Sequence, residues 1–345
     1  MSDRNQSIRF IYIILSIFLL GLIFLNLAIG SVSVPSAVFL HFFDTNTPEN
    51  EIVWRHIILE SRMPQAVTAI LAGSSLGLAG LQMQTLFRNP LAGPSILGIS
   101  SGASLGVALL TLGSGIGTGF IGSNILNELG VHLAAFIGAF LVLFIVLLAA
   151  KKVKNNASLL IIGIMVGYAV SSIIGLLNFV GQQGEVHAFV IWGLGSFANV
   201  QNSQLVLFII LVFPALFLSS LLIKPMNAML LGESYAQNLG VNLKRVRWQL
   251  ILLSGYLTAI ITAFTGPIAF IGLATPHLAR LLFKSSDHKQ LIPAVLLLGT
   301  IISLACNLLA RMPFFQDVLP INVITSLFGA PLVIYLIIKR KQIGF

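Results

Sequence analysis

The sequence predicts an all-α polytopic membrane protein of about ten transmembrane helices with both termini cytoplasmic, and three observations lead to this fold class. Hydrophobic residues make up 57% of the 345 residues and charged residues only 8%, whereas soluble domains carry roughly a quarter charged residues. Apolar segments of about 20 residues, the length that crosses the hydrocarbon core, recur along the chain. Lys and Arg are concentrated in alternate breaks between them. We therefore expect residues 1–345 to form a single transmembrane domain.

The apolar segments place ten helices along the chain, separated by short polar breaks. Their expected ranges are 8–29, 64–86, 94–112, 131–150, 157–180, 203–223, 248–265, 267–283, 291–310 and 318–338. The first is expected to be a retained helix, because its apolar run is too long for a signal peptide and no clear cleavage site follows. The eighth is short and contains two prolines. The break before it, Gly266-Pro267, is either a tight turn or a kink.

The distribution of basic residues tests this helix count and sets the orientation. With the N-terminus inside, sixteen of the 19 Lys and Arg fall in cytoplasmic segments, and the other three are Arg55, Arg62 and Arg311. This asymmetry is the positive-inside bias of membrane proteins, and a kink at Gly266 would remove much of it. The net charge of +9 is therefore a topology signal. Nucleic acid is a poor alternative partner, because the sequence has no basic stripe with interleaved aromatic residues.

Small residues recur at four-residue spacing within several of the expected helices. The rows are Gly73 and Gly77; Gly98, Gly102 and Gly106; and Gly163, Gly167, Ser171 and Gly175. This spacing puts each row on one helix face, where two backbones can approach closely. The rows predict tight helix packing. The row in 157–180 has a second interpretation, a smooth face that lines the path of a bulky substrate, and composition does not separate the two uses.

The sequence lacks the residue patterns of intramembrane catalysis and of self-contained energy supply. The apolar cores contain essentially no Asp, Glu, Lys or Arg, whereas proton-coupled transporters commonly keep such groups at mid-membrane. No HExxH motif, Cys/His cluster or GxSxG turn is present. The single cysteine, Cys306, is interpreted as a small core residue. A phosphate-binding GxxxxGK[ST] loop is also missing, so we expect neither an enzyme nor a bound metal or cofactor. Any nucleotide energy must come from another polypeptide.

The inner segment 224–247 contains an amphipathic pattern. Apolar residues recur at helical spacing in Leu231, Tyr235 with Ala236, and Leu239. A short helix is predicted, because Gly232 permits a turn into it, Glu233 complements the positive end of the helix dipole, and Gly240 suits a C-terminal cap. The pattern leaves two interpretations open, a helix that rests on lipid headgroups and a helix that docks a protein.

Four separated motifs, in this order, resemble the FecCD-type permease family of bacterial iron-siderophore, haem and cobalamin ABC importers. They are RMPQAVTAILAGSSLGLAGLQMQTLFRNPLAGPSILGISSGASLG (62–106), LGESYAQNLGV (231–241), GPIAFIGLATPHLAR (266–280) and LPINVITSLFGAP (319–331). The resemblance implies ten helices per subunit in a bacterial inner membrane. It also implies three partners: a second permease subunit, a cytoplasmic ABC ATPase dimer and an extracytoplasmic substrate-binding protein.

The same resemblance assigns roles to particular residues. It places the ATPase-coupling contact in segment 224–247, at Leu231, Gly232, Glu233, Ala236, Leu239 and Gly240. It places the row Gly163, Gly167, Ser171 and Gly175 beside the translocation path at the interface of two permeases. It makes Arg62 and Arg311 candidates for docking acidic residues of the binding protein; the alternative is that they anchor helix ends. Gln65 replaces a basic residue of some relatives, and Asn322 replaces a frequent glycine.

These implications define the expected function as ATP-driven import of an iron(III)-siderophore, with haem and cobalamin as alternative cargoes. A secondary, ion-coupled transporter is the runner-up, disfavoured by the missing mid-membrane carboxylates. A membrane scaffold that transports nothing is a third class, and it would have no need for small residues facing a path.

Overall fold

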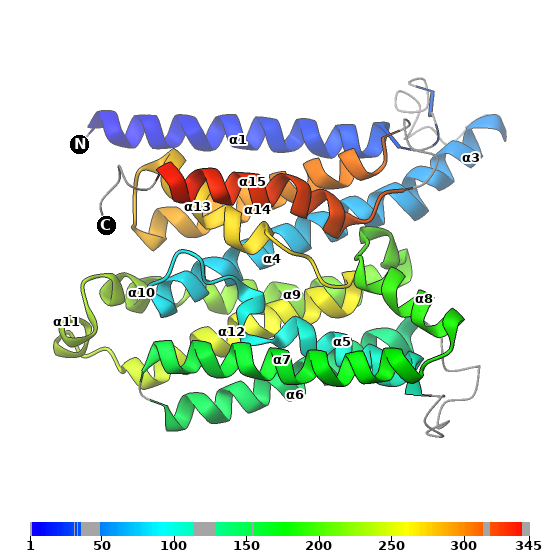
Figure 1. Ribbon diagram of the computed structural model, residues 1–345. Helices are drawn as coiled ribbons and strands as arrows, with labels where there is room; N and C mark the ends of the chain where they lie inside the picture. The colour runs from blue at the N-terminus through cyan, green and yellow to red at the C-terminus, as the bar shows by residue number, and fades with distance from the viewer. Residues whose placement is uncertain are drawn as a thin grey trace.

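Long helices that lie side by side along a common direction dominate the computed structural model of the chain (Figure 1). It describes residues 2–30, 32, 34–35, 49–113, 128–153, 155–312 and 318–339. Within these residues, seven helices are long and apolar enough to cross a membrane, and three shorter apolar helices accompany them. The described residues contain no strand. The prediction of an all-α fold with about ten membrane helices is thereby confirmed.

The apolar helices correspond one to one with the expected ranges, with ends that differ by a few residues. They are α1 (Ser2–Ala28), α4 (Met63–Phe87), α5 (Ile99–Thr111), α6 (Glu128–Lys152), α7 (Asn156–Val180), α9 (Asn202–Ser220), α12 (Leu243–Thr265), α13 (Ile271–Phe283), α14 (His288–Ala310) and α15 (Ile321–Lys339). Shorter helical elements connect them: α3 (Glu49–Ile57), the π-helical turn η1 (Ile58–Arg62), the 3₁₀ turn η2 (Pro94–Leu97), α8 (Gln183–Gly193), the 3₁₀ turn η4 (Phe197–Asn199), α10 (Ile223–Leu230) and α11 (Glu233–Asn238).

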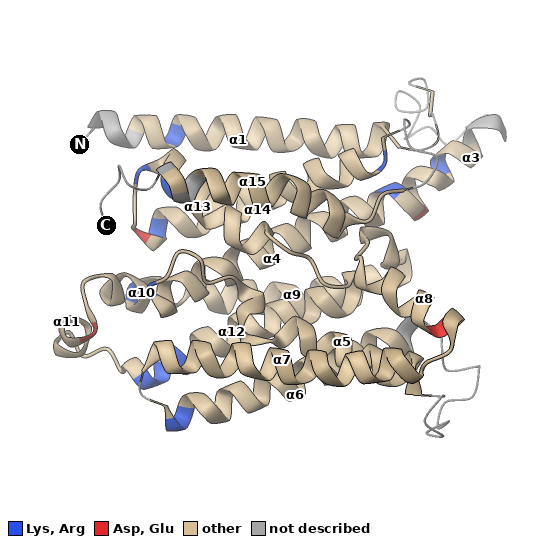
Figure 2. Cartoon of the chain, in the orientation of Figure 1, with Lys and Arg blue, Asp and Glu red and all other residues tan. Residues whose placement is uncertain are grey.

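The two ends of the bundle differ in their connections and in their charge. The start of α1 and the end of α15 lie at the same end as α10 and α11, whereas α3 and α8 lie at the opposite end (Figure 1). Most of the Lys and Arg drawn in Figure 2 gather at the end of α10 and α11. This arrangement agrees with an even number of crossings. The cytoplasmic placement of that end stays a prediction, and residues 340–345 lie outside the described part of the chain.

The break between the seventh and eighth predicted helices is a turn and not a kink. Gly266 has a φ of +75° and ends α12, and the chain stays non-helical until α13 begins at Ile271. The expected start at residue 267 was therefore too early. Pro267 has no backbone N–H to donate. Two residues later, the backbone amide of Ala269 donates to Oδ1 of Asn322 (3.1 Å). Asn322, whose replacement of a frequent glycine had no sequence interpretation, thus holds this turn against the start of α15.

The predicted tight packing of the glycine rows is confirmed for the rows that begin at Gly73 and Gly98. A Cβ added to Gly77 would lie 2.9 Å from the carbonyl oxygen of Val295 in α14. One added to Gly102 would lie 2.6 Å from the carbonyl oxygen of Gly138 in α6. Real Cβ atoms essentially never come that close to such an oxygen. Backbone therefore rests on backbone in these pairs, as in other membrane bundles that associate through small residues.

Helix α8 was not predicted, because the segment between the fifth and sixth expected helices was interpreted only as an outer connection. The helix begins with a capping box, in which Glu185 accepts a hydrogen bond from the amide of Gln182 (3.4 Å). Capping boxes of the Ser/Thr-x-x-Glu type are a recognised start signal, and here Gln182 stands in the first position. Phe189 is buried beneath the helix. At 11 residues α8 is too short to cross the membrane.

We expect Gly102→Ala to destabilise the folded protein, because the new methyl group must displace the backbone of α6. Overpacking of this kind costs about 1–3 kcal/mol, which exceeds the ~1 kcal/mol that alanine contributes through helix propensity. Gly175→Ala is the matched control, since nothing lies within 4 Å of its added Cβ. Thermal unfolding in detergent should show a lower midpoint for Gly102→Ala only. Equal midpoints would contradict the close packing of α5 on α6.

Candidate functional site

The predicted amphipathic helix in segment 224–247 is present as α11, and the two glycines that bound it have positive φ. Gly232 has a φ of +120° and separates α10 from α11, and Gly240 has a φ of +81° just after α11. The amide of Val241 returns to the carbonyl of Ala236 (3.0 Å), which closes the last turn. The segment therefore forms two short helices at a sharp angle, and it projects beyond the ends of the long helices (Figure 1).

Apolar side chains on α10, α11 and their junctions face outward and form what we call the coupling surface. Its members are 48–66% exposed. They are Leu230, Leu231, Tyr235 and Leu239. Of the six residues predicted to couple to an ATPase, Leu231 and Leu239 lie on this surface and Gly232, Glu233 and Gly240 beside it. Ala236 instead points inward and is fully buried. Exposed apolar side chains gathered in this way are typical of a site that contacts a protein or the membrane.

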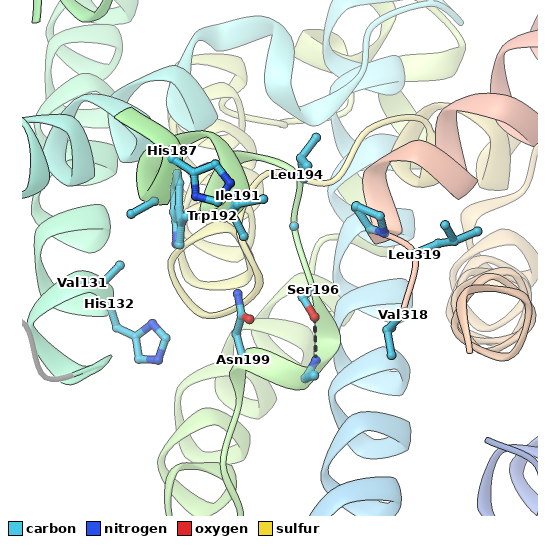
Figure 3. Close-up of a pocket in the computed structure, with 14 residues that line it drawn as sticks. Val131, His132, His187, Ile191, Trp192, Leu194, Ser196, Asn199, Val318 and Leu319 are labelled. Carbon is cyan, nitrogen blue, oxygen red and sulfur yellow. Dashed lines mark hydrogen bonds between the residues drawn. The ribbon is translucent and has the colours of Figure 1, made fainter. Parts of the chain in front are cut away.

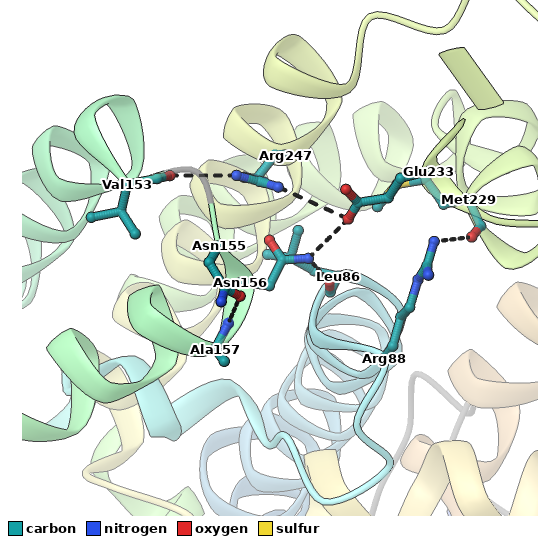
Figure 4. Close-up of polar contacts among 9 residues, drawn as sticks. All are labelled: Leu86, Arg88, Val153, Asn155, Asn156, Ala157, Met229, Glu233 and Arg247. Carbon is teal, nitrogen blue, oxygen red and sulfur yellow. Dashed lines mark hydrogen bonds and ion pairs between the residues drawn. The ribbon is translucent and has the colours of Figure 1, made fainter. Parts of the chain in front are cut away.

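Polar contacts hold α11, which carries part of the coupling surface, against α4, α7 and α12 (Figure 4). Oε1 of Glu233, the first residue of α11, lies 3.9 Å from Nη2 of Arg247 in α12. It also accepts a hydrogen bond from Nδ2 of Asn156 in α7 (3.3 Å). The same Nδ2 donates to the carbonyl of Leu86 in α4 (2.8 Å), and Arg247 donates to the carbonyl of Val153 (3.4 Å). Helices α4, α7, α11 and α12 therefore meet at one polar cluster.

A second brace joins α4 to α10. Arg88 caps the end of α4 in a left-handed conformation with a φ of +47°. Its guanidinium group donates to the carbonyl of Met229 near the end of α10 (3.1 Å; Figure 4). From the sequence, Glu233 was predicted to complement the helix dipole and, by resemblance, to belong to the ATPase-coupling contact, but not to pair with Arg247. Sequence reasoning missed Arg88, Asn156 and Arg247, because their partners are distant in the sequence.

The small-residue row of α7 divides into two halves with different surroundings. A Cβ on Gly163 would lie 2.9 Å from Cα of Leu97, and one on Gly167 would lie 3.7 Å from Cα of Gly98. These two glycines therefore serve packing. Ser171 is exposed, and Gly175 has nothing within 4 Å of its added Cβ. Only the second half is free to face a path or a second subunit.

The two candidate docking arginines are buried at the end of the bundle opposite the coupling surface. Arg62 is 3% and Arg311 5% exposed. Arg62 donates to the carbonyls of Leu27 and Ala28 (2.7 Å each) and of Val32. Arg311 donates to the carbonyl oxygen and Oδ1 of Asn26 (3.0 and 3.1 Å).

Both guanidinium groups thus satisfy carbonyl oxygens at and just beyond the C-terminal end of α1, where the helix dipole favours positive charge. Burial, and then the nearby charge of Arg62, lowers the pKa of Arg311 to about 10. These contacts favour the interpretation of Arg62 and Arg311 as anchors of a helix end. No contact in the structure bears on binding-protein docking, and that role stays a prediction.

A pocket of about 640 Å³ opens between α6, α8, η4 and the segment before α15 (Figure 3). It lies near the end of the bundle that carries α8. Most of its lining is apolar, and its polar side chains include His132, His187 and Asn199. The ring of His132 is held by the carbonyl of Ala263 (2.9 Å), whereas His187 is exposed. Its size and lining are those of small-molecule sites. Sequence reasoning missed the pocket, because α8 forms one of its walls.

The bundle of long apolar helices defines a polytopic membrane protein. The chain belongs to the FecCD transport family, whose match covers residues 17–339. It is 34% identical over 318 residues to the hemin transport system permease protein HmuU of Yersinia pestis, covering 92% of this chain and 93% of that one. It is also 34% identical over 288 residues to the vitamin B12 import system permease protein BtuC of Klebsiella pneumoniae, covering 83% and 84%.

The fold agrees with this family. A solved inward-facing structure assigned to the metal-chelate type of ABC transporter superposes with a TM-score of 0.81 and 29% identity, over 95% of this chain and 99% of that one. The resemblance inferred from the four motifs is therefore confirmed. The chain is a permease of an ABC importer of the metal-chelate, haem or vitamin B12 type.

The two interpretations of the buried arginines differ in a measurable way. We expect Arg311→Met to lower the thermal midpoint of the isolated permease by several degrees, because the loss of hydrogen bonds from a charged donor to Asn26 costs about 1.5–3 kcal/mol. Arg245→Met, at an exposed arginine, is the control and should leave the midpoint unchanged. An unchanged midpoint for Arg311→Met, together with weaker affinity for the substrate-binding protein, would instead establish the docking role.

Proposed function

We propose that this permease imports an iron(III)-siderophore or a related ferric chelate, using ATP that a partner subunit hydrolyses. The coupling surface is the observation that carries the proposal. Its apolar residues face outward, and its base is fixed to three membrane helices through Glu233, Asn156 and Arg247. A helix that merely rests on lipid headgroups has no need of this brace. A rigid apolar contact is suited to receiving force from a protein partner.

Several partners follow from this proposal. A cytoplasmic ABC ATPase dimer would bind the coupling surface, since the sequence contains no GxxxxGK[ST] loop of its own. A second permease, identical or paralogous, would complete the path, and an extracytoplasmic substrate-binding protein would deliver the cargo. Residues 1–345 would form one permease domain in the bacterial inner membrane, with both termini and segment 224–247 cytoplasmic.

The cargo is the finer part of the proposal. The relatives carry haem and vitamin B12 in their names, and the structural neighbour is of the metal-chelate type. A ferric chelate is favoured because it is the commonest cargo of the family, and haem and cobalamin remain the alternatives.

The set of charged side chains that are buried argues against the alternative of an ion-coupled secondary transporter. Among the described residues no Asp or Glu side chain is buried, and the buried charged groups are Arg62 and Arg311 at helix ends. Proton-coupled carriers commonly keep carboxylates at mid-membrane. The exposed half of the α7 row also argues against a scaffold that transports nothing, because Ser171 is exposed and no described residue lies within 4 Å of a Cβ added to Gly175.

We expect the double variant Leu231→Glu with Leu239→Glu to abolish co-purification with the ATPase, because it places two charges in an apolar contact. The permease itself should stay folded, since both side chains are exposed. Ser286→Glu, at an exposed residue between α13 and α14, is the control for added charge at this end. Retention of the ATPase by the double variant would contradict the proposed coupling surface.

Uptake of a ⁵⁵Fe-labelled siderophore by the reconstituted complex tests both the cargo and the path. Wild type should accumulate iron, and this uptake should stop when the nucleotide site of the ATPase is broken. Ser171→Trp should block uptake at normal assembly if the exposed half of the row lines the path. Ile173→Trp, at an exposed residue on another face of α7, should not. Uptake of haem or cobalamin alone would overturn the ferric cargo, and equal uptake by both Trp variants would overturn the path.

A further inference from the structure

A buried histidine joins three helices at the end of the bundle that carries the coupling surface. His288 is the first residue of α14 and is 1% exposed. Its ring lies between Thr85 in the last turn of α4 and Asn227 in α10. Neither the coupling surface nor the α7 row includes any of these three residues, and no sequence motif singled them out for a role.

The hydrogen bonds of Asn227 fix the orientation of its amide and the tautomer of His288. Oδ1 of Asn227 accepts from the backbone N–H of His288 (2.8 Å), and Nδ2 donates to Oδ1 of Asp287 (2.6 Å). The reverse orientation would set an NH₂ group against a backbone donor and an oxygen against a carboxylate. Because Oδ1 of Asn227 is an acceptor, Nδ1 of His288, 2.7 Å away, carries a hydrogen and donates to it.

Asp287 supports this arrangement from the other side. It is the N-cap of α14, and its carboxylate accepts the backbone N–H of Lys289 (2.9 Å). Partial burial acts to raise the pKa of the Asp287 carboxyl, but the hydrogen bonds from Lys289 and Asn227 and the nearby charges outweigh it. The net pKa is below its ordinary value. An ionised carboxylate is the partner that the NH₂ group of Asn227 requires.

The other ring nitrogen carries the chain of contacts into α4. Nε2 of His288 and the carbonyl oxygen of Leu81 each lie 2.8 Å from Oγ1 of Thr85. With the ring hydrogen on Nδ1, Nε2 is an acceptor, so the single hydroxyl hydrogen of Thr85 makes the link when it is donated to Nε2 and not to Leu81. The next residue, Leu86, accepts the bond from Asn156, and Arg88 donates to α10. Thr85, Leu86 and Arg88, at the end of α4, therefore contact α14, α7 and α10 respectively.

Breaking the contacts of His288 and Thr85, which are buried, would leave their polar atoms without partners, and that is costly. A displacement of α10 is therefore favoured to carry α4 and α14 with it. We propose that Asn227, His288 and Thr85 are positioning residues that transmit movement of α10 to α4 and α14. This inference rests on the proposed function, since it assumes that an ATPase moves α10 and α11.

The test uses the complete reconstituted importer, with its ATPase and binding protein, and measures siderophore uptake and ATP hydrolysis together. Thr85→Val keeps the side-chain shape but removes the hydroxyl that contacts His288, and Thr85→Ser retains that hydroxyl. We expect Thr85→Val to lower uptake per ATP about fivefold, the effect of losing one net hydrogen bond. Thr85→Ser should stay within about twofold of wild type. Thr258→Val is the matched control, because among the described residues its hydroxyl donates to the carbonyl of Ser254, within its own helix.

Two further measurements make the outcome decisive. Hydrogen exchange should be faster in α10 and at the amide of His288 in Thr85→Val than in Thr85→Ser, and unchanged in Thr258→Val. If Thr85→Val does not assemble, Asn227→Asp serves instead, because it keeps the shape of Asn227 but cannot donate to Asp287. Normal uptake per ATP in these variants would overturn the transmission role. Failure of wild type to show ATPase-dependent uptake would overturn the proposed function instead, so the two failures are distinguishable.

Discussion

The direct contact of backbone with backbone between α4 and α14 is the constraint on which the rest of the structure depends. Gly73 and Gly299 face each other so closely that a Cβ on either would overlap the carbonyl of the other, and Gly77 rests on Val295 one turn further along. Lipid provides little hydrophobic drive for two helices to associate, so close packing must supply the attraction. Because glycine has no side chain, these contacts set the spacing between α4 and α14. Both helices also carry polar groups at their ends.

The polar groups at the two ends of α4 contact different helices. At one end Arg62, in the turn just before α4, fixes the C-terminal end of α1. At the other, Thr85, Leu86 and Arg88 contact α14, α7 and α10. A well-packed helix behaves as a rigid body. Helix α4 is therefore suited to transmit a displacement at the coupling surface to the opposite end of the bundle, where the pocket beside α8 lies.

Hydropathy and charge were sufficient to predict the ten apolar helices, because each of these signals lies within a single segment. The breaks at Gly266 and Gly240 were also identified from the sequence, since glycine at a helix end is a local sequence signal. What was missed depends on contacts across the chain. The buried Arg311 donates to the carbonyl of Asn26, from which it is separated by 285 residues in the sequence. The link from His288 to Thr85 spans 203 residues. Helix α8 was missed for another reason: it is too short to register as a membrane span and it follows directly on one.

The position of Asn26 has a consequence for how the protein is made. Helix α1 leaves the ribosome before α14, yet Asn26 donates to the carbonyl of Leu304, accepts from Asn307 and is held by Arg311, some 280 residues later. Its polar side chain must therefore wait in the bilayer, or at its surface, until α14 has been synthesised. Synthesis of α1 and completion of its polar contacts are thus separated by most of the chain. The buried Asn26 marks the point where α1 and α14 are joined after both have been made.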